Sequence, residues 1–235
     1  MHIKNVLQLI EIFIFGLTLV FVNSWRKEIT IDPASIIDIE GNVYTTIRIG
    51  KQLWMKGNLK ITKYNDGTPI TYITDSIQWK TAGAAYCWYK NDSTTYKNTY
   101  GALYNWYAVN PADNGNKNIC PVGWHIPTDM EWETLTNFLG GTNIAGGKMK
   151  EFGTSHWSSP NTGANNNSDF MGLPGGNRNF VDGSFFGFGS LGMWWSSVDG
   201  DISSATNWGL YFEDSIAYRL YSSKRCGYSV RCLKD

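Results

Sequence analysis

Few side chains of this sequence have the types and spacing that catalysis requires. After residue 24 its histidines are His125 and His156, and no serine lies in the G-x-S-x-G pattern that exposes a nucleophile. His125 stands between Trp124 and Ile126, where a hydrogen-bonded structural role is the stronger interpretation. The sequence therefore does not indicate nucleophilic catalysis.

Paired carboxylates could instead hydrolyse a glycosidic bond, and Glu213 with Asp214 is the best free pair. Neighbouring residues on a strand point to opposite faces of a sheet, so these two carboxylates would not flank one bond. Glu131 is better explained as part of a helix cap. The sequence predicts no catalytic residue, and we do not expect an enzyme.

Metal ligands are also poorly spaced. No two cysteines form a C-x-x-C pair, the spacing typical of structural zinc sites. The run from Asn165 to Asp169 carries oxygen donors that suit Ca²⁺, but asparagine-rich loops more often satisfy their own turns. We predict no metal and no cofactor.

Cys87, Cys120, Cys226 and Cys232 allow three disulfide pairings. We favour Cys120 with Cys232, because this bridge ties the middle of the chain to its end and closes a loop of more than a hundred residues. In the chain-entropy model such a bridge contributes about 4 to 5 kcal/mol. Cys87 with Cys226 is a weaker alternative.

Aromatic side chains are the remaining signal for a binding site. Trp194, Trp195, Trp208 and Tyr211 lie in the loop-rich second half, and exposed Trp and Tyr mark interfaces and sugar-stacking platforms. The alternative is that these rings fill the core. We predict a ligand site at these four residues, with one member of the Trp194–Trp195 pair buried and the other partly exposed.

The elements that position these residues begin after an export signal. Lys4 precedes an apolar run of 16 residues, 7–22, and Ser24 ends a segment suited to signal peptidase. We predict a signal peptide over 1–24, a linker over 25–37 and a single domain over 38–235. An uncleaved N-terminal anchor is the alternative, and only then would the chain contact a membrane.

Composition narrows the class of protein further. Lys+Arg and Asp+Glu balance at 20 each and the pI is about 6.8, which gives no indication of nucleic-acid binding. Charged residues are only 17%, aromatics reach 15% and there are 25 Gly, a composition typical of a loop-rich domain with an aromatic core and not of a disordered chain.

Periodicity predicts an α+β domain, with helices preceding a series of short strands. A hairpin is expected over 43–49 and 52–55, around Gly50. One helix is expected over 99–109, because Tyr100, Leu103, Tyr104 and Tyr107 would share a face. A second is expected over 129–139, with Thr128 and Glu131 as its capping box.

Several motifs together resemble the Fibrobacter succinogenes major paralogous domain, a module of exported bacterial proteins. They cover residues 38–235 and comprise C-P-V-G-W-H-I-P-T-D-M-E-W at 120–132 and stretches at 38–70, 86–109, 146–150, 173–176, 194–197 and 229–232. That family is similar to the C-type lectin-like fold, which implies a small twisted antiparallel sheet, two flanking helices and long ordered loops. In many members an acylated Cys stands about where Trp25 stands here.

The resemblance, with the lack of catalytic residues, leads us to expect an exported, non-enzymatic binding or adhesion module. Its ligand would be a glycan or a surface protein, outside a bacterial cell or in the envelope. A structural or assembly component of the cell surface is the alternative. An enzyme related to formylglycine-generating oxidases, which share the fold, is less favoured.

Overall fold

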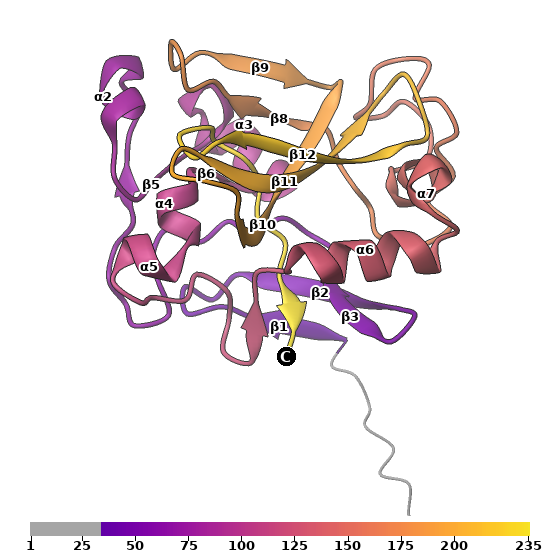
Figure 1. The fold of residues 1–235 in the computed structure, drawn as a ribbon, viewed down its shortest axis with the longest axis horizontal. Coiled ribbons are helices and arrows are strands. Elements are labelled where there is room, and N and C mark those ends of the chain that lie inside the picture. Colours follow the sequence, from indigo (N-terminus) through magenta and orange to yellow (C-terminus); the bar gives the residue numbers. More distant parts are fainter. Residues whose placement is uncertain (1–33) are drawn as a thin grey trace, which may run out of the picture. The chain divides into compact units, whose positions relative to one another are not determined.

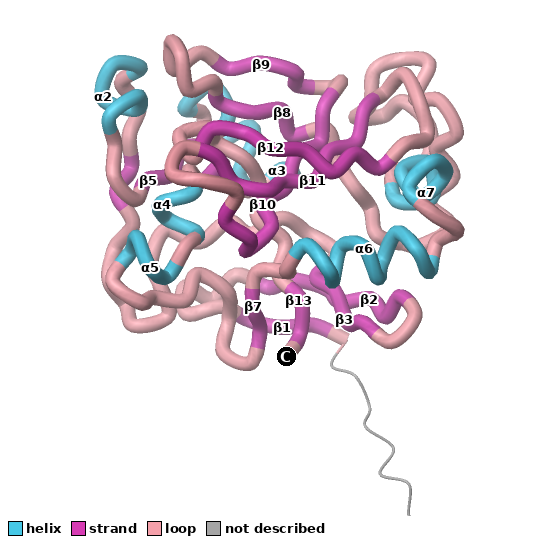
Figure 2. Tube along the Cα trace, viewed as in Figure 1, coloured by secondary structure: helices cyan, strands magenta, loops and turns pink. Residues whose placement is uncertain are grey.

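The computed structural model describes residues 34–235, so the expected signal peptide lies outside the described residues, as does most of the expected linker. Loops and turns connect short strands and a few short helices (Figure 2). Within residues 34–235 no helix combines the length and the apolar character that a membrane span needs.

The helices are short, and α6 is the longest of those described. They are α2 Ser76–Thr81, α3 Ser93–Tyr100, α4 Trp106–Val109, α5 Pro111–Asn114, α6 Asp129–Phe138 and α7 Thr142–Met149, with a 3₁₀ turn at Tyr89–Asn91. The strands are β1 Ser35–Ile37, β2 Val43–Ile49, β3 Gln52–Met55, β4 Thr71–Tyr72, β5 Ala85–Cys87, β6 Leu103–Tyr104, β7 Trp124–His125, β8 Gly175–Arg178, β9 Phe185–Phe188, β10 Leu191–Asp199, β11 Ser204–Tyr211, β12 Ala217–Ser223 and β13 Leu233–Lys234.

The largest sheet brings the two ends of the described chain together (Figure 1). Its strands are antiparallel neighbours in the order β1-β2-β3-β13-β7, so the last strand lies between β3 and β7. The predicted hairpin is confirmed, and Gly50 makes its turn with φ +61°. The disulfide Cys120–Cys232 fastens the end of the chain just before β13 and is also confirmed.

A second sheet, β10-β11-β12, is antiparallel, and α6 lies between it and β3 (Figure 1). Trp132 of α6 has its ring centroid 4.9 Å from that of Trp54 on β3 and 6.0 Å from that of Trp208 on β11. The predicted capping box starts this helix: Thr128 Oγ1 accepts from the backbone N–H of Glu131, and the Glu131 carboxylate accepts from that of Thr128. The apolar stripe of α6 therefore packs on both sheets.

The helix predicted over 99–109 is wrong. Helix α3 ends at Tyr100, then β6 pairs with β5, and the separate α4 begins at Trp106. Gly101 has φ +75°, and a Cβ there would lie 2.6 Å from the Leu59 carbonyl oxygen, so the chain turns away where backbone segments meet closely. Asn105 then caps α4 through the Ala108 N–H.

The structure is thus a mixed α and β domain built mainly from antiparallel sheets. Short apolar runs at 156–157 and 170–173, between clusters of Gly, Asn and Ser, indicate two of the expected short strands. The structure has loops at both places, apart from one bridge at Gly172. Helix α7 was not predicted, because its sequence T-N-I-A-G-G-K-M has no apolar stripe. Its glycines instead admit a neighbouring segment: a Cβ on Gly146 would lie 2.4 Å from the Ile216 carbonyl oxygen.

Candidate functional site

The structure places the three tryptophans of the predicted site in the core. Trp194, Trp195 and Trp208 are 1%, 0% and 2% exposed, so the expectation of one exposed indole in the Trp194–Trp195 pair is wrong. Each indole N–H also has an internal acceptor. These are Asn58 Oδ1 at 2.8 Å for Trp194, the Tyr104 carbonyl at 2.8 Å for Trp195 and Asp129 Oδ1 at 2.9 Å for Trp208. These rings offer no face to a ligand.

Tyr211 is half-buried, and its ring packs edge-on against Tyr218 with 5.0 Å between centroids. It does not join the tryptophans in one surface. Trp194 lies opposite Trp208 in the β10–β11 pairing and Trp195 lies opposite Asn207, so the two neighbouring indoles point to opposite faces of the sheet. The four predicted residues therefore do not form a common platform.

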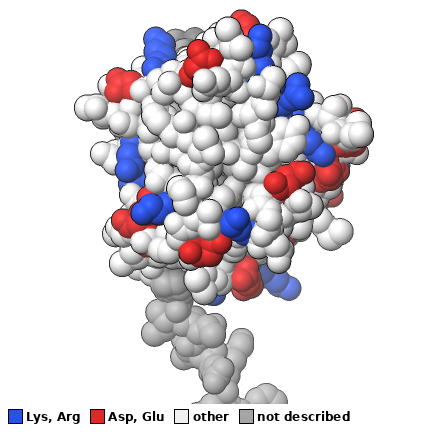
Figure 3. Space-filling model, turned by 90° about the vertical axis from the view of Figure 1, so that its left-hand side faces the viewer, with Lys and Arg blue, Asp and Glu red and all other residues white. Residues whose placement is uncertain are grey.

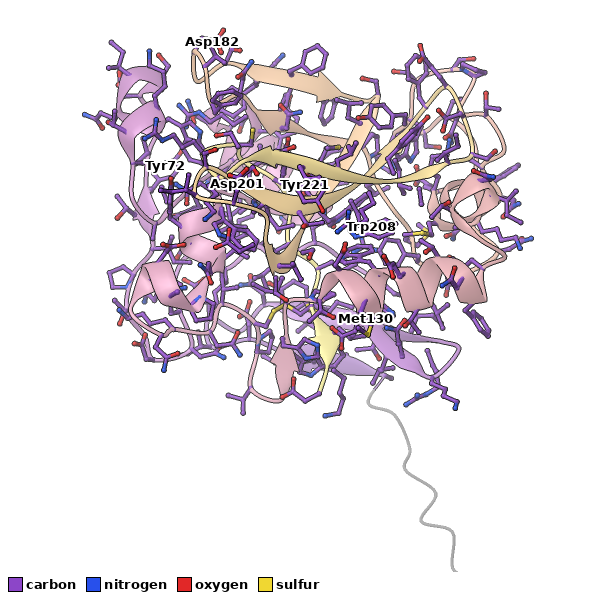
Figure 4. All side chains as sticks on the ribbon, in the orientation of Figure 1. Tyr72, Met130, Asp182, Asp201, Trp208 and Tyr221 are labelled. Atoms are coloured by element: carbon purple, nitrogen blue, oxygen red, sulfur yellow. A yellow bond between two sulfur atoms is a disulfide. The ribbon has the colours of Figure 1, made fainter. Side chains whose placement is uncertain are left out.

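A cleft of about 440 Å³ is the better candidate, and it lies at the tip of the β10–β11 hairpin. Its volume falls within the range of small-ligand sites. Four segments line it: Tyr107 of α4, Phe180 of the turn after β8, Ile202, Ser203 and Ser204 of the hairpin tip, and Ser223 and Arg225 at and just beyond the end of β12. Figure 4 labels Asp201 at this tip.

The apolar part of the cleft is unusually open to solvent. Ile202 is 97% exposed and Phe180 is 42% exposed, while Tyr107 is half-buried. Exposed aromatic and branched side chains beside a concavity are the residues that contact the apolar faces of ligands. This group can pack on a ring or an aliphatic segment.

The hairpin tip is shaped by Asp201. Its Oδ1 accepts from the backbone N–H of Ser203 at 2.7 Å and of Ser204 at 2.8 Å, and from Ser203 Oγ at 3.1 Å. These bonds to the carboxylate lower the pKa of Asp201 to about 2, so it is ionised at neutral pH. The tip is held in a defined turn that presents Ile202 outward.

Arg225 has a fixed backbone and a free head group. Its carbonyl accepts from the buried Trp79 Nε1 at 2.9 Å, and the Cys226 N–H donates to the Ser223 carbonyl at 2.9 Å. Within residues 34–235 its guanidinium has no carboxylate or carbonyl partner, and the residue is exposed. Arg225 is thus the polar group at this cleft that is available to a ligand.

Arg178 of β8 joins segments that carry two of the cleft's lining residues. It is 1% exposed and donates to three carbonyls, those of Gly183 at 3.0 Å, Ile73 at 2.5 Å and Thr74 at 2.8 Å. Its own backbone exchanges two hydrogen bonds with Gly227. One residue therefore ties the turn that carries Phe180 to the segment that carries Arg225.

A second cleft, of about 340 Å³, includes Lys117, Asn118 and His125 in its lining. These three side chains are already engaged. Lys117 Nζ donates to the Asn114 carbonyl, the Asn118 amide donates to the Trp124 carbonyl, and both ring nitrogens of His125 face carboxylates. This second cleft is the weaker candidate for a ligand site.

Both described histidines have structural partners. His125 lies between Asp235, at 2.7 Å, and Glu131, at 3.0 Å, and His156 contacts Glu151 at 2.8 Å. In residues 34–235 no three His, Cys, Asp or Glu side chains come together as metal ligands would. In the asparagine-rich loop, Asp169 pairs with Lys56 at 2.7 Å.

Sequence reasoning missed the cleft because no single segment carries it. Tyr107 was assigned to a helix face, and Ile202 and Arg225 lie in short polar stretches without a motif. The one local signal was D-G-D-I-S-S at 199–204, where an isolated Ile interrupts turn-forming residues.

Fold and site together define a class: a mixed α and β domain whose chain end is fastened by a disulfide and whose loops form a shallow cleft. The sequence model of the family called the Fibrobacter succinogenes major domain matches residues 47–234. The chain belongs to this family. Comparison with curated proteins finds no significant match, and comparison with solved structures finds none either.

Proposed function

We propose that this protein is an exported, non-enzymatic module that binds a glycan or a surface protein through the cleft at the β10–β11 tip. The observation that carries the proposal is the juxtaposition there of exposed Ile202 and Phe180 with the unpartnered guanidinium of Arg225. An apolar surface beside a free hydrogen-bond donor is the usual composition of a small-ligand site.

A C-type lectin-like fold is part of this proposal. The placement of β13 between β3 and β7 supports it, because the chain ends of that fold are expected in neighbouring strands. The loop-rich second half, which carries most of the cleft, supports it as well. Export to an oxidising compartment, into the medium or the cell envelope, is consistent with the Cys120–Cys232 bridge.

Assembly at the cell surface is the second candidate function. The side of the molecule where α2 and α5 lie has a broad area without charged side chains, with Lys, Arg, Asp and Glu at its margins (Figure 3). An uncharged centre with a charged rim is typical of protein interfaces. Sedimentation of the purified protein over a range of concentrations tests this candidate, since a surface used in assembly would give concentration-dependent oligomers.

A glycan array and a pull-down from envelope extract test the binding proposal. Ile202→Ser and Arg225→Ala should each weaken the signal, because they remove the apolar and the polar contact of the cleft. Met130→Ala is the matched control: Met130 is 74% exposed on α6, away from the tip (Figure 4). Wild-type signal from both cleft variants would place the site elsewhere, and blank results from both assays would reject the binding proposal.

A further inference from the structure

The charge on the cleft lining is unbalanced. Of the seven lining residues, Arg225 alone carries a formal charge, and no carboxylate is among them. The cation next to it, Lys224, is 6% exposed and is neutralised by Asp199, with Nζ and Oδ1 2.7 Å apart. Arg225 is therefore the one charged residue of the lining itself, while the ionised Asp201 lies in the hairpin turn beside it.

Two buried arginines and a buried lysine of the described chain have their charged groups engaged. Arg178 and Arg231 are each 1% exposed and donate to backbone carbonyls, and Lys150 is fully buried with three carbonyl acceptors. Arg225 differs, because its backbone is fixed by Trp79 while its guanidinium remains free. A planar guanidinium on a fixed backbone suits bidentate binding of a carboxylate.

The rest of the lining favours a sugar as the carrier of that carboxylate. Tyr107 and Phe180 offer aromatic rings for the C–H face of a pyranose. The Ser223 oxygen accepts from the Arg225 N–H, and its hydroxyl can still donate to the polar edge of the sugar. A flat peptide-binding groove would instead need an open strand edge or a long apolar channel.

We propose that the ligand of this cleft is an acidic oligosaccharide of the uronic-acid class, and that Arg225 binds its carboxylate. This inference rests on the proposed binding function and names the ligand class of the same site. Tyr107 and Phe180 stack on the sugar ring, so the affinity has a charge-dependent and a charge-independent part.

Asp201, next to the cleft, allows a test of whether the ligand carries a negative charge. Its carboxylate is ionised and belongs to the same turn as Ile202 and Ser203, so it repels an anionic ligand. Asp201→Asn keeps the Oδ1 acceptor for the backbone N–H groups of Ser203 and Ser204 but removes the charge. A carboxylate ligand should bind this variant more tightly, and a neutral ligand should bind it unchanged.

The experiment is a calorimetric titration of the full-length protein with trigalacturonate and, in parallel, with its fully methyl-esterified form, which keeps the shape but lacks the charge. Wild type should bind the free acid about 10-fold more tightly than the ester. Arg225→Gln should remove that preference and leave the affinity for the ester unchanged. Asp201→Asn should strengthen binding of the acid about 2- to 5-fold, an effect that added salt reduces. Met130→Ala should match wild type with both.

Equal affinity for acid and ester in wild type, or an Arg225→Gln variant that retains the preference, would overturn the inference while leaving glycan binding intact. Failure to bind either oligosaccharide would also overturn it. The proposed function itself would fall only with a blank glycan array and a blank envelope pull-down. Binding of a free peptide C-terminus in place of the uronate would reassign Arg225 to a protein ligand.

Discussion

Trp208 donates its indole N–H to Asp129 Oδ1 at 2.9 Å, and this bond joins strand β11 to the first turn of helix α6. The other oxygen of the same carboxylate accepts from Arg219 Nε on β12. Asp129 also stands at a helix N-terminus, where a negative charge is favoured. A single carboxylate thus fastens two strands to the helix between the sheets, which makes Trp208 a structural residue.

The first prediction follows from that role. Trp208→Ala removes a buried indole and leaves Asp129 short of a donor, so it should lower the free energy of unfolding by about 3 to 5 kcal/mol. Urea denaturation followed by circular dichroism measures the change. Ile202→Ser, at an exposed position, is the control and should shift stability by less than about 0.5 kcal/mol. A loss below about 1 kcal/mol for Trp208→Ala would contradict its assignment to the core.

The second prediction concerns the cysteines. The Cys120–Cys232 bridge spans 112 residues, so replacing both with Ser should cost about 4 to 5 kcal/mol. Cys87 and Cys226 are buried free thiols, and burial raises the pKa of the Cys87 thiol to about 12. In the folded protein neither should react with iodoacetamide, whereas both should react in urea. Mass spectrometry of non-reduced, alkylated protein checks both points, and any link that involves Cys87 would disprove the pairing.

The third prediction separates support of the cleft from contact with the ligand. Arg178→Lys keeps the positive charge, but the lysine ammonium lacks the planar guanidinium that donates to all three carbonyls. The turn that carries Phe180 should therefore loosen. We expect a stability loss of about 2 to 4 kcal/mol together with weaker ligand binding. Arg225→Gln should instead weaken binding with unchanged stability. Equal stability of the two variants would show that Arg178 does not hold the cleft.

The fourth prediction is alkaline unfolding. Burial raises the pKa of Tyr86 from 10.0 to about 12, and it raises that of the fully buried Tyr104 well above 10. Above pH 10 the unfolded chain loses phenol protons that the native state keeps, so the free energy of unfolding should fall as the pH rises from 10 toward 12. Denaturation at several pH values gives the slope, and the part of the phenolate absorbance that comes from the buried tyrosines should appear together with unfolding. Complete ionisation of all tyrosines in folded protein near pH 10 would contradict this.

Features that depend on neighbouring residues, such as a helix cap or a hairpin turn, could be predicted from the sequence. Features that depend on contacts between distant segments, such as the cleft, could not. Thr128 and Glu131 fix the start of α6, and Gly50 fixes the turn between β2 and β3, because both effects act within a few residues. A single helix was indicated by the spacing of Tyr100, Leu103, Tyr104 and Tyr107. These residues belong to α3, β6 and α4, and residues of separate strands and helices that face one core can share the spacing of a helix face. The cleft depends on contacts such as Trp79 Nε1 with the Arg225 carbonyl, 146 residues apart, which no local pattern encodes.

The fifth prediction tests whether close packing decides the position of α7. Ala has the higher helix propensity by about 1 kcal/mol, so propensity alone would make Gly146→Ala stabilising. A Cβ there would, however, lie 2.4 Å from the Ile216 carbonyl oxygen and 2.8 Å from that of Ser215, and backbone atoms cannot move aside cheaply. Overpacking of this kind costs about 1 to 3 kcal/mol or more, and it should outweigh the gain in propensity. We therefore expect a net loss of about 1 to 2 kcal/mol in the free energy of unfolding, measured in urea.

Gly83→Ala is the matched control: a Cβ there meets nothing within 4 Å, so stability should be unchanged or slightly higher. If Gly146→Ala proved as stable as Gly83→Ala, then α7 would not be held against the segment before β12 as tightly as these distances require.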